Sequence, residues 1–158
     1  MNRTTGFIPT APTPTDEPPV TSGTFWPTIE LGRLRAIMRT DGTITAERLR
    51  HAVIDAISQV NGDLTGWSLN RKGEGHATLA DVPADIIDGE SVLVHWYRRA
   101  VYSMARANLY ERYLDSSATA DAIKDAVPRE LTADDLRRDA RFAIRDILGI
   151  THSTVELI

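Results

Sequence analysis

The spacing of apolar residues along the chain predicts four helices. Apolar positions recur at steps of three and four, which places them on one face of a helix. The second and fourth helices have clear starts, because Thr45 and Thr132 are good N-caps with apolar residues at the staple positions. Gly149 supplies the stop of the fourth helix. The predicted helices cover residues 30–40, about 46–70, about 90–114 and 133–148.

The second helix contains a weak point. Asn61-Gly62 and Gly66 lie within its periodic pattern, and a glycine in a helix interior costs about 1 kcal/mol relative to alanine. Two interpretations stay open: the helix continues to about Asn70, or it breaks near Asn61.

The class predicted from these elements is all-α, because strand signals are nearly absent. We expect a compact bundle of about four helices with an extended N-terminal arm and a short extended C-terminal tail. The arm carries five prolines among threonines, and proline lacks the donor that helices and sheets need. The predicted organisation is an arm over 1–24, a helical domain over 25–149 and a docking tail over 150–158.

The third helix has two unusual faces. One is apolar, and a plainly charged opposite face would be typical of an exposed helix. Here that opposite face mixes aromatic residues with arginines, which are enriched in protein interfaces. Either this helix contacts a partner with that face, or it is a central helix buried within the monomer. The candidate interface residues on it are His95, Arg98, Tyr102, Arg106 and Tyr113.

Further candidate interface residues lie near the C-terminus. Arg138, Arg141 and Arg145 form a basic stripe on the fourth helix, which either contacts an acidic partner or is a solvated face with ordinary ion pairs. Val155 and Ile158 are apolar residues of the tail, which is suited to act as an added strand or a docking peptide.

Charge and composition narrow the possible functions. The formal net charge is −4 and cysteine is absent, which excludes disulfides and thiolate chemistry. An acidic chain is a poor DNA-binding protein, because such proteins neutralise phosphates with Lys and Arg. No apolar run approaches the roughly 20 residues that a membrane span requires, and the N-terminus does not resemble a signal peptide. We therefore expect no membrane partner, and a location in the cytoplasm or in a particle assembled there.

Candidate chemistry is sparse. Asp81, Asp85, Asp88 and Glu90 cluster in sequence, and a metal-dependent nuclease would need such oxygen ligands. Their spacing matches no calcium loop, and no phosphate-binding loop is present. No two of the four histidines share a helix at metal-ligand spacing. We expect no enzyme activity, metal or cofactor, with a small packaging nuclease as the alternative.

Several stretches resemble one known family. Residues 79–91 read Leu-Ala-Asp-Val-Pro-Ala-Asp-Ile-Ile-Asp-Gly-Glu-Ser and precede an aromatic, arginine-bearing helix that ends Leu-Tyr-Glu-Arg-Tyr. Together with Phe25-Trp26-Pro27, Arg48-Leu49-Arg50 and Leu136-Arg137-Arg138-Asp139, this resembles the head completion (head stabilisation) proteins of temperate contractile-tailed bacteriophages. The resemblance covers residues 25–158.

This resemblance implies a structural virion protein without catalysis. Members of the family dock on the portal protein after DNA packaging and form a ring, usually a dodecamer, that continues the DNA channel. Packaged DNA then passes through the lumen without sequence-specific binding, and neck or tail-terminator proteins attach below. The implied location is the neck between head and tail, after assembly in the host cytoplasm. Another neck or tail interaction module is the remaining alternative within this class.

Overall fold

Helices dominate the computed structural model, which describes residues 17–38, 44–114 and 132–150. A two-stranded hairpin, β1 (Ile86–Ile87) with β2 (Glu90–Ser91), lies before the longest helix. The largely helical class predicted from the sequence is confirmed. The helices are α1 (Leu31–Met38), α2 (Ala46–Asp63), α3 (Thr65–Gly73), α4 (Val92–Leu114) and α6 (Ala133–Leu148).

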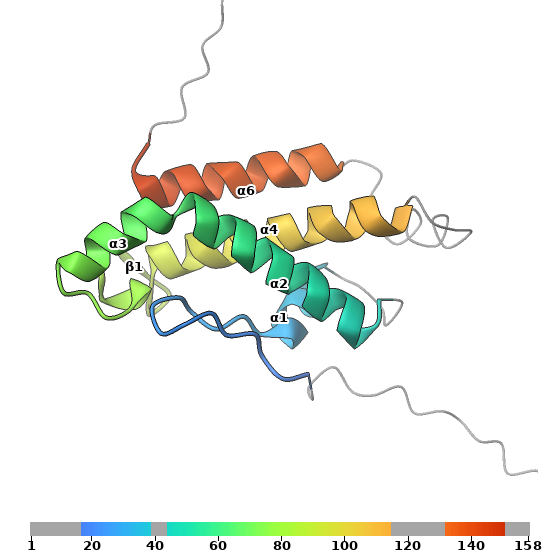
Figure 1. The fold of residues 1–158 in the computed structure, drawn as a ribbon, viewed down its shortest axis with the longest axis horizontal. Helices are drawn as coiled ribbons and strands as arrows, with labels where there is room; N and C mark the ends of the chain where they lie inside the picture. The colour runs from blue at the N-terminus through green and yellow to red at the C-terminus, as the bar shows by residue number, and fades with distance from the viewer. Residues whose placement is uncertain (1–16, 39–43, 115–131, 151–158) are drawn as a thin grey trace, which may run out of the picture.

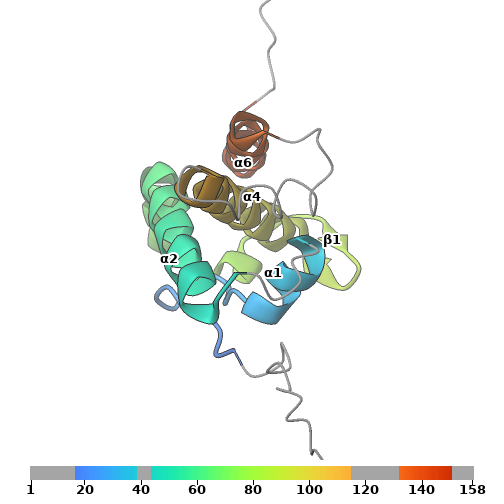
Figure 2. The ribbon, with the colours of Figure 1, turned by 90° about the vertical axis from the view of Figure 1, so that its right-hand side faces the viewer.

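Helix α4 forms the centre of the molecule. It lies between α2 and α6 (Figures 1 and 2), and every residue from 100 to 105 is buried. A helix that is buried around its circumference needs no charged face. The structure therefore supports the interpretation of the third predicted helix as a central helix of the monomer.

Helix α6 packs along α4 through small and branched residues. Ala140 and Ala143 are fully buried, and small side chains let two helix axes approach closely. Two ion pairs between the helices flank this contact. Arg99 of α4 pairs with Asp139 of α6, and Arg137 of α6 pairs with Glu111 of α4. Helix α6 begins at the predicted cap, Thr132, whose hydroxyl accepts a hydrogen bond from the Asp135 N–H at 3.1 Å.

The second predicted helix is interrupted, which was one of the two interpretations. The break lies at Leu64 and not at Asn61. Helix α2 ends at Asp63 and α3 begins at Thr65. Leu64 is fully buried, so the change of direction occurs where a large side chain enters the core. The chain does not form a continuous helix to Asn70.

The N-terminal segment joins the fold earlier than predicted. Val20 is buried, and it exchanges two backbone hydrogen bonds of 2.9 Å with Ile29. Glu17 accepts hydrogen bonds from the Arg35 guanidinium at 2.7–3.1 Å. The packed domain thus begins by Glu17 and not at Phe25, because these contacts bind residues 17–24 to α1 and to the core. The remaining arm residues, 1–16, lie outside the described residues.

Tyr97 of α4 connects three parts of the core. Its ring is fully buried and stacks on Trp26 with the ring centroids 4.8 Å apart. Its hydroxyl donates a 2.8 Å hydrogen bond to the side-chain oxygen of Asn61 in α2. Burial raises the pKa of Tyr97.

The raised pKa of Tyr97 predicts a loss of stability at alkaline pH. The unfolded phenol ionises near pH 10.0, whereas the folded one stays neutral to higher pH. Its stabilising contribution is therefore complete below about pH 10 and is lost as the pH rises further, since the unfolded state then releases protons that the folded state retains. Urea unfolding at pH 8 and pH 11 should show a lower unfolding free energy at pH 11. The Tyr97→Phe variant should show a smaller difference; an equal difference would contradict the assignment to Tyr97.

Candidate assembly surfaces

The β1–β2 hairpin is built around a tight turn. Asp88 and Gly89 both have positive φ, 50° and 74°, as the two central residues of a type I′ turn require. Ile86 pairs with Ser91 and Ile87 with Glu90. The Val92 N–H donates a 2.9 Å hydrogen bond to the Asp85 carbonyl, so α4 starts directly from the hairpin.

Two predicted interface residues, His95 and Arg98, support this hairpin. His95 Nε2 lies 3.0 Å from the carbonyl oxygen of Ile87, so this nitrogen carries the proton and donates. Arg98 Nη1 lies 2.5 Å from Glu90 Oε2. Both side chains are half-buried. Their contacts fix the hairpin to the first two turns of α4.

The hairpin presents apolar residues to solvent. Ile86 is 66% exposed and Ile87 is 55% exposed, and two large apolar side chains together at a hairpin are a feature of interaction sites. Asp85 and Asp88 flank them and are also exposed. The interpretation of the sequence missed this hairpin, although Asp-Gly between Ile-Ile and Glu-Ser is a strong hairpin signal.

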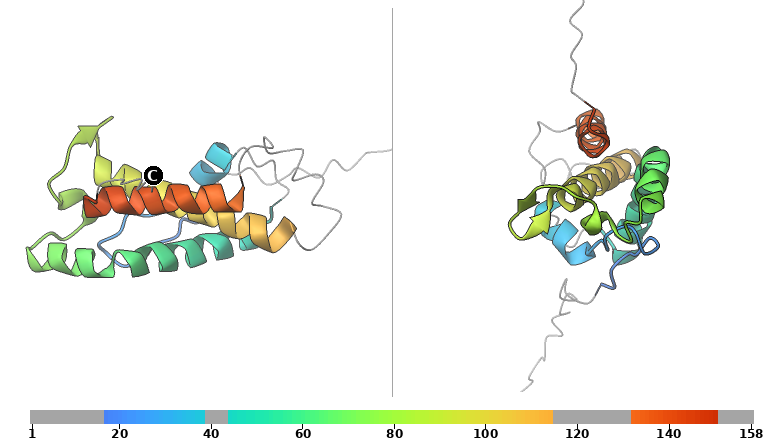
Figure 3. Two further views of the ribbon diagram at one scale, coloured as in Figure 1. Left: turned by 90° about the horizontal axis from the view of Figure 1, so that it is seen from above. Right: turned by 90° about the vertical axis from the view of Figure 1, so that its left-hand side faces the viewer.

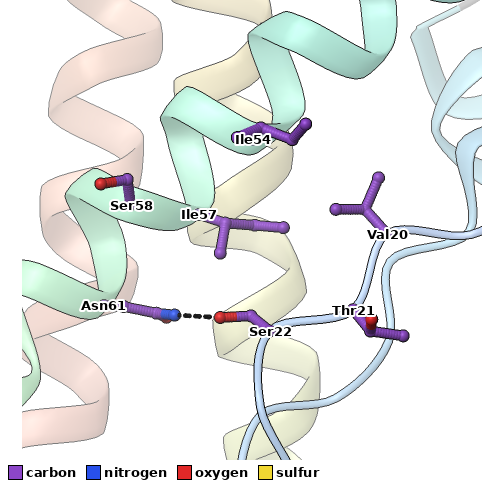
Figure 4. Close-up of a pocket in the computed structure, with 7 residues that line it drawn as sticks. All are labelled: Val20, Thr21, Ser22, Ile54, Ile57, Ser58 and Asn61. Atoms are coloured by element: carbon purple, nitrogen blue, oxygen red, sulfur yellow. Dashed lines mark hydrogen bonds between the residues drawn. The ribbon is translucent and has the colours of Figure 1, made fainter.

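A groove lies between α2 and the N-terminal segment (Figure 4). Its volume is about 400 Å³, and three apolar and four polar residues line it. Ile54 is 48% exposed there. The Asn61 side-chain amide donates a 2.8 Å hydrogen bond to the Ser22 hydroxyl, which ties one wall to the other. The lining residues are Val20, Thr21, Ser22, Ile54, Ile57, Ser58 and Asn61.

Tyr102 and Arg106, two further predicted interface residues of α4, lie in different surroundings. Tyr102 is only 7% exposed within the monomer, so it has little area for a partner. Arg106 is half-buried and lines a polar pocket of about 470 Å³ between α4 and α6, beside Asp139 and Phe142. Tyr113 lies in the last turn of α4, and its side chain is outside the described part of the structure.

The predicted basic stripe lies on α6. Arg138 is exposed and pairs with Asp135 at 2.5 Å, Arg141 is exposed, and Arg145 is half-buried. The pair of Arg138 and Asp135 fits the solvated-face interpretation, since such contacts three residues apart are ordinary on helices. Val155 and Ile158 lie outside the described residues.

The acidic cluster is used in local structure. Asp81 accepts hydrogen bonds from the Thr78 N–H and hydroxyl at 2.9 and 2.8 Å. Asp88 lies in the hairpin turn, and Glu90 pairs with Arg98. Within residues 17–38, 44–114 and 132–150, no group of three His, Cys, Asp or Glu side chains is placed to hold a metal ion. In the same ranges no helix has the length and apolar character of a membrane span.

The fold and its surfaces define a class: a small helical protein whose exposed apolar residues include Ile86 and Ile87 of the hairpin and Ile54 of the groove. Residues 20–158 match the family model of the phage head completion protein (GPL), so the chain belongs to this family. The chain is 42% identical over 134 residues to the head completion/stabilization protein of Escherichia phage P2, which covers 85% of this chain and 79% of that protein. No solved structure matches significantly. The family resemblance drawn from the sequence is confirmed, and the protein is a structural component of the phage head.

Proposed function

We propose that this protein docks on the portal once the head is filled with DNA and forms a ring, a dodecamer, that continues the DNA channel. The ring stabilises the filled head and gives neck or tail-terminator proteins their attachment site between head and tail. The observation that carries the proposal is the family match over residues 20–158. The matched range extends from Val20 through α6, so it covers both the hairpin and the groove.

The charge of the chain supports this function. The net charge is −4, and an acidic ring around a channel repels the phosphates of DNA instead of binding them. Such a wall lets packaged DNA pass without sequence-specific contacts.

Electron microscopy of the purified full-length protein with its portal protein tests this proposal. Particles with both proteins should show an added ring-shaped layer on the portal, coaxial with its channel. A portal without any added layer would contradict docking, and a layer without rotational symmetry would contradict the ring. Incubation with linear duplex DNA and Mg²⁺ is the control for the nuclease alternative; the DNA should remain intact.

A further inference from the structure

The β1–β2 hairpin and the groove beside α2 lie on different sides of the molecule. The β1–β2 hairpin projects with Ile86 and Ile87 at its surface, whereas the groove beside α2 is hollow. Figures 2 and 3 show α2 with the N-terminal segment on one side of α4 and the hairpin on the other. One copy therefore cannot use its own hairpin to fill its own groove.

We infer that the hairpin of one copy inserts into the α2 groove of the next copy around the ring. This contact joins two different patches, so it is heterologous, and repetition of such a contact generates a closed ring when the rotation closes. The inference rests on the proposed function, because it names the surfaces that hold the ring together. The partner is a second copy of this chain.

The side-chain directions fit this arrangement. Consecutive residues of a strand point to opposite faces, so Ile86 and Ile87 extend from opposite sides of the hairpin. The groove has two walls, the segment with Val20 and the α2 face with Ile54. A hairpin inserted edge-on thus places one isoleucine against each wall, and the exposed area of Ile54 is covered.

The charges around the two surfaces are complementary. Asp85 and Asp88 beside the hairpin make no ion pair with any described residue. Arg50 lies one helical turn before Ile54 and donates a 2.7 Å hydrogen bond to the Pro18 carbonyl, and it has no carboxylate partner in the described ranges. In the proposed interface, Asp85 and Asp88 of one copy come close to Arg50 of the next. These charges have no ion-pair partner in the described part of the monomer, and their attraction favours the correct orientation of the two copies.

Cysteine cross-linking tests the contact directly, because the chain contains no cysteine. A double variant, Ile54→Cys with Ile86→Cys, is assembled with portal protein and treated with a short thiol cross-linker. Denaturing gels should show a ladder of dimers, trimers and larger products. A mixture of the two single variants should give dimers only, because each copy then has one reactive surface. The matched control is Leu69→Cys with Ile86→Cys, since Leu69 is 60% exposed on α3 outside the groove; it should give no ladder.

Charge-changing variants test the same contact without cross-linking. Ile86→Asp with Ile87→Asp should leave the unfolding transition unchanged, because both side chains are exposed, and should reduce ring formation at least tenfold. Arg50→Glu should weaken assembly, and Asp85→Arg in the same chain should restore it.

Three outcomes would overturn the inference. These are rings of the double aspartate variant at wild-type yield, cross-links confined to single chains, and cross-links from position 86 to the portal protein. Each can occur while the wild-type protein still forms its ring on the portal, so the proposed function would survive. A wild-type protein that forms no ring would overturn both.

Discussion

Deletion of residues 1–24 is expected to cost the protein a large part of its stability. The deletion removes Glu17, whose carboxylate binds the Arg35 guanidinium; the exposures of these side chains are 15% and 10%. Leaving one member of a buried ion pair alone costs about 3–5 kcal/mol. Loss of buried Val20 adds about 1.5–3 kcal/mol. Since natural domains unfold with roughly 5–15 kcal/mol, a loss on the order of 5 kcal/mol should shift the urea midpoint strongly or leave the chain unfolded.

Deletion of residues 1–16 is the matched control, because it keeps Glu17, Val20 and their contacts. Its urea midpoint should stay close to that of the full chain. If the two deletions unfold at the same urea concentration, residues 17–24 do not contribute as the structure indicates. An assembly assay on the arm should use the shorter deletion, since the longer one confounds lost docking with lost folding.

Much of the fold was predictable because its signals are local. Thr132 and Asp135 form a capping box three residues apart, and Thr45 caps α2 through the Arg48 N–H at 3.3 Å. Apolar periodicity then defines the helices that follow. These features depend on neighbours within a turn or two, which a single sequence displays directly.

The features that the sequence did not reveal depend on distant partners. Val20 is one apolar residue among prolines and threonines, and only its pairing with Ile29 makes it a core residue. The strands of the hairpin have two residues each, which is too short for a visible alternation. The Asp88-Gly89 turn was the available signal, and it predicts the hairpin once it is weighed with its flanking isoleucines.

The candidate site shows the same limit. A helix with two apolar or aromatic faces needs two neighbours, but the sequence does not tell whether the second neighbour belongs to the same chain. For Tyr102 it does, because its side chain is buried within the monomer, near Glu30 and Arg33 at the start of α1. For His95 and Arg98 the interface role stays a prediction, and in the monomer their contacts hold the hairpin in place. The exposed residues of that hairpin, Ile86 and Ile87, were not among the predicted interface residues.

Replacement of Tyr97 is the second change with a large expected effect. Tyr97→Ala removes a fully buried ring that stacks on Trp26, and aromatic-to-alanine changes in cores cost about 3–5 kcal/mol. Tyr97→Phe keeps the ring and removes only the hydroxyl that donates to Asn61. It should cost about 1–2 kcal/mol, because the Asn61 oxygen then loses its partner. Urea unfolding of both variants at pH 7 measures these losses.

The comparison of these two variants also links the core to the groove. Asn61 accepts from Tyr97 and donates to Ser22, and Asn61 and Ser22 line the groove. Tyr97→Phe should therefore reduce cross-linking between positions 54 and 86 of neighbouring copies while most of the stability remains. Tyr110→Phe is the control, because Tyr110 is half-buried on α4 and does not line the groove. An unfolding free energy unchanged by Tyr97→Ala would contradict the central position of this side chain, since no compact core loses a buried aromatic ring without a cavity or a collapse.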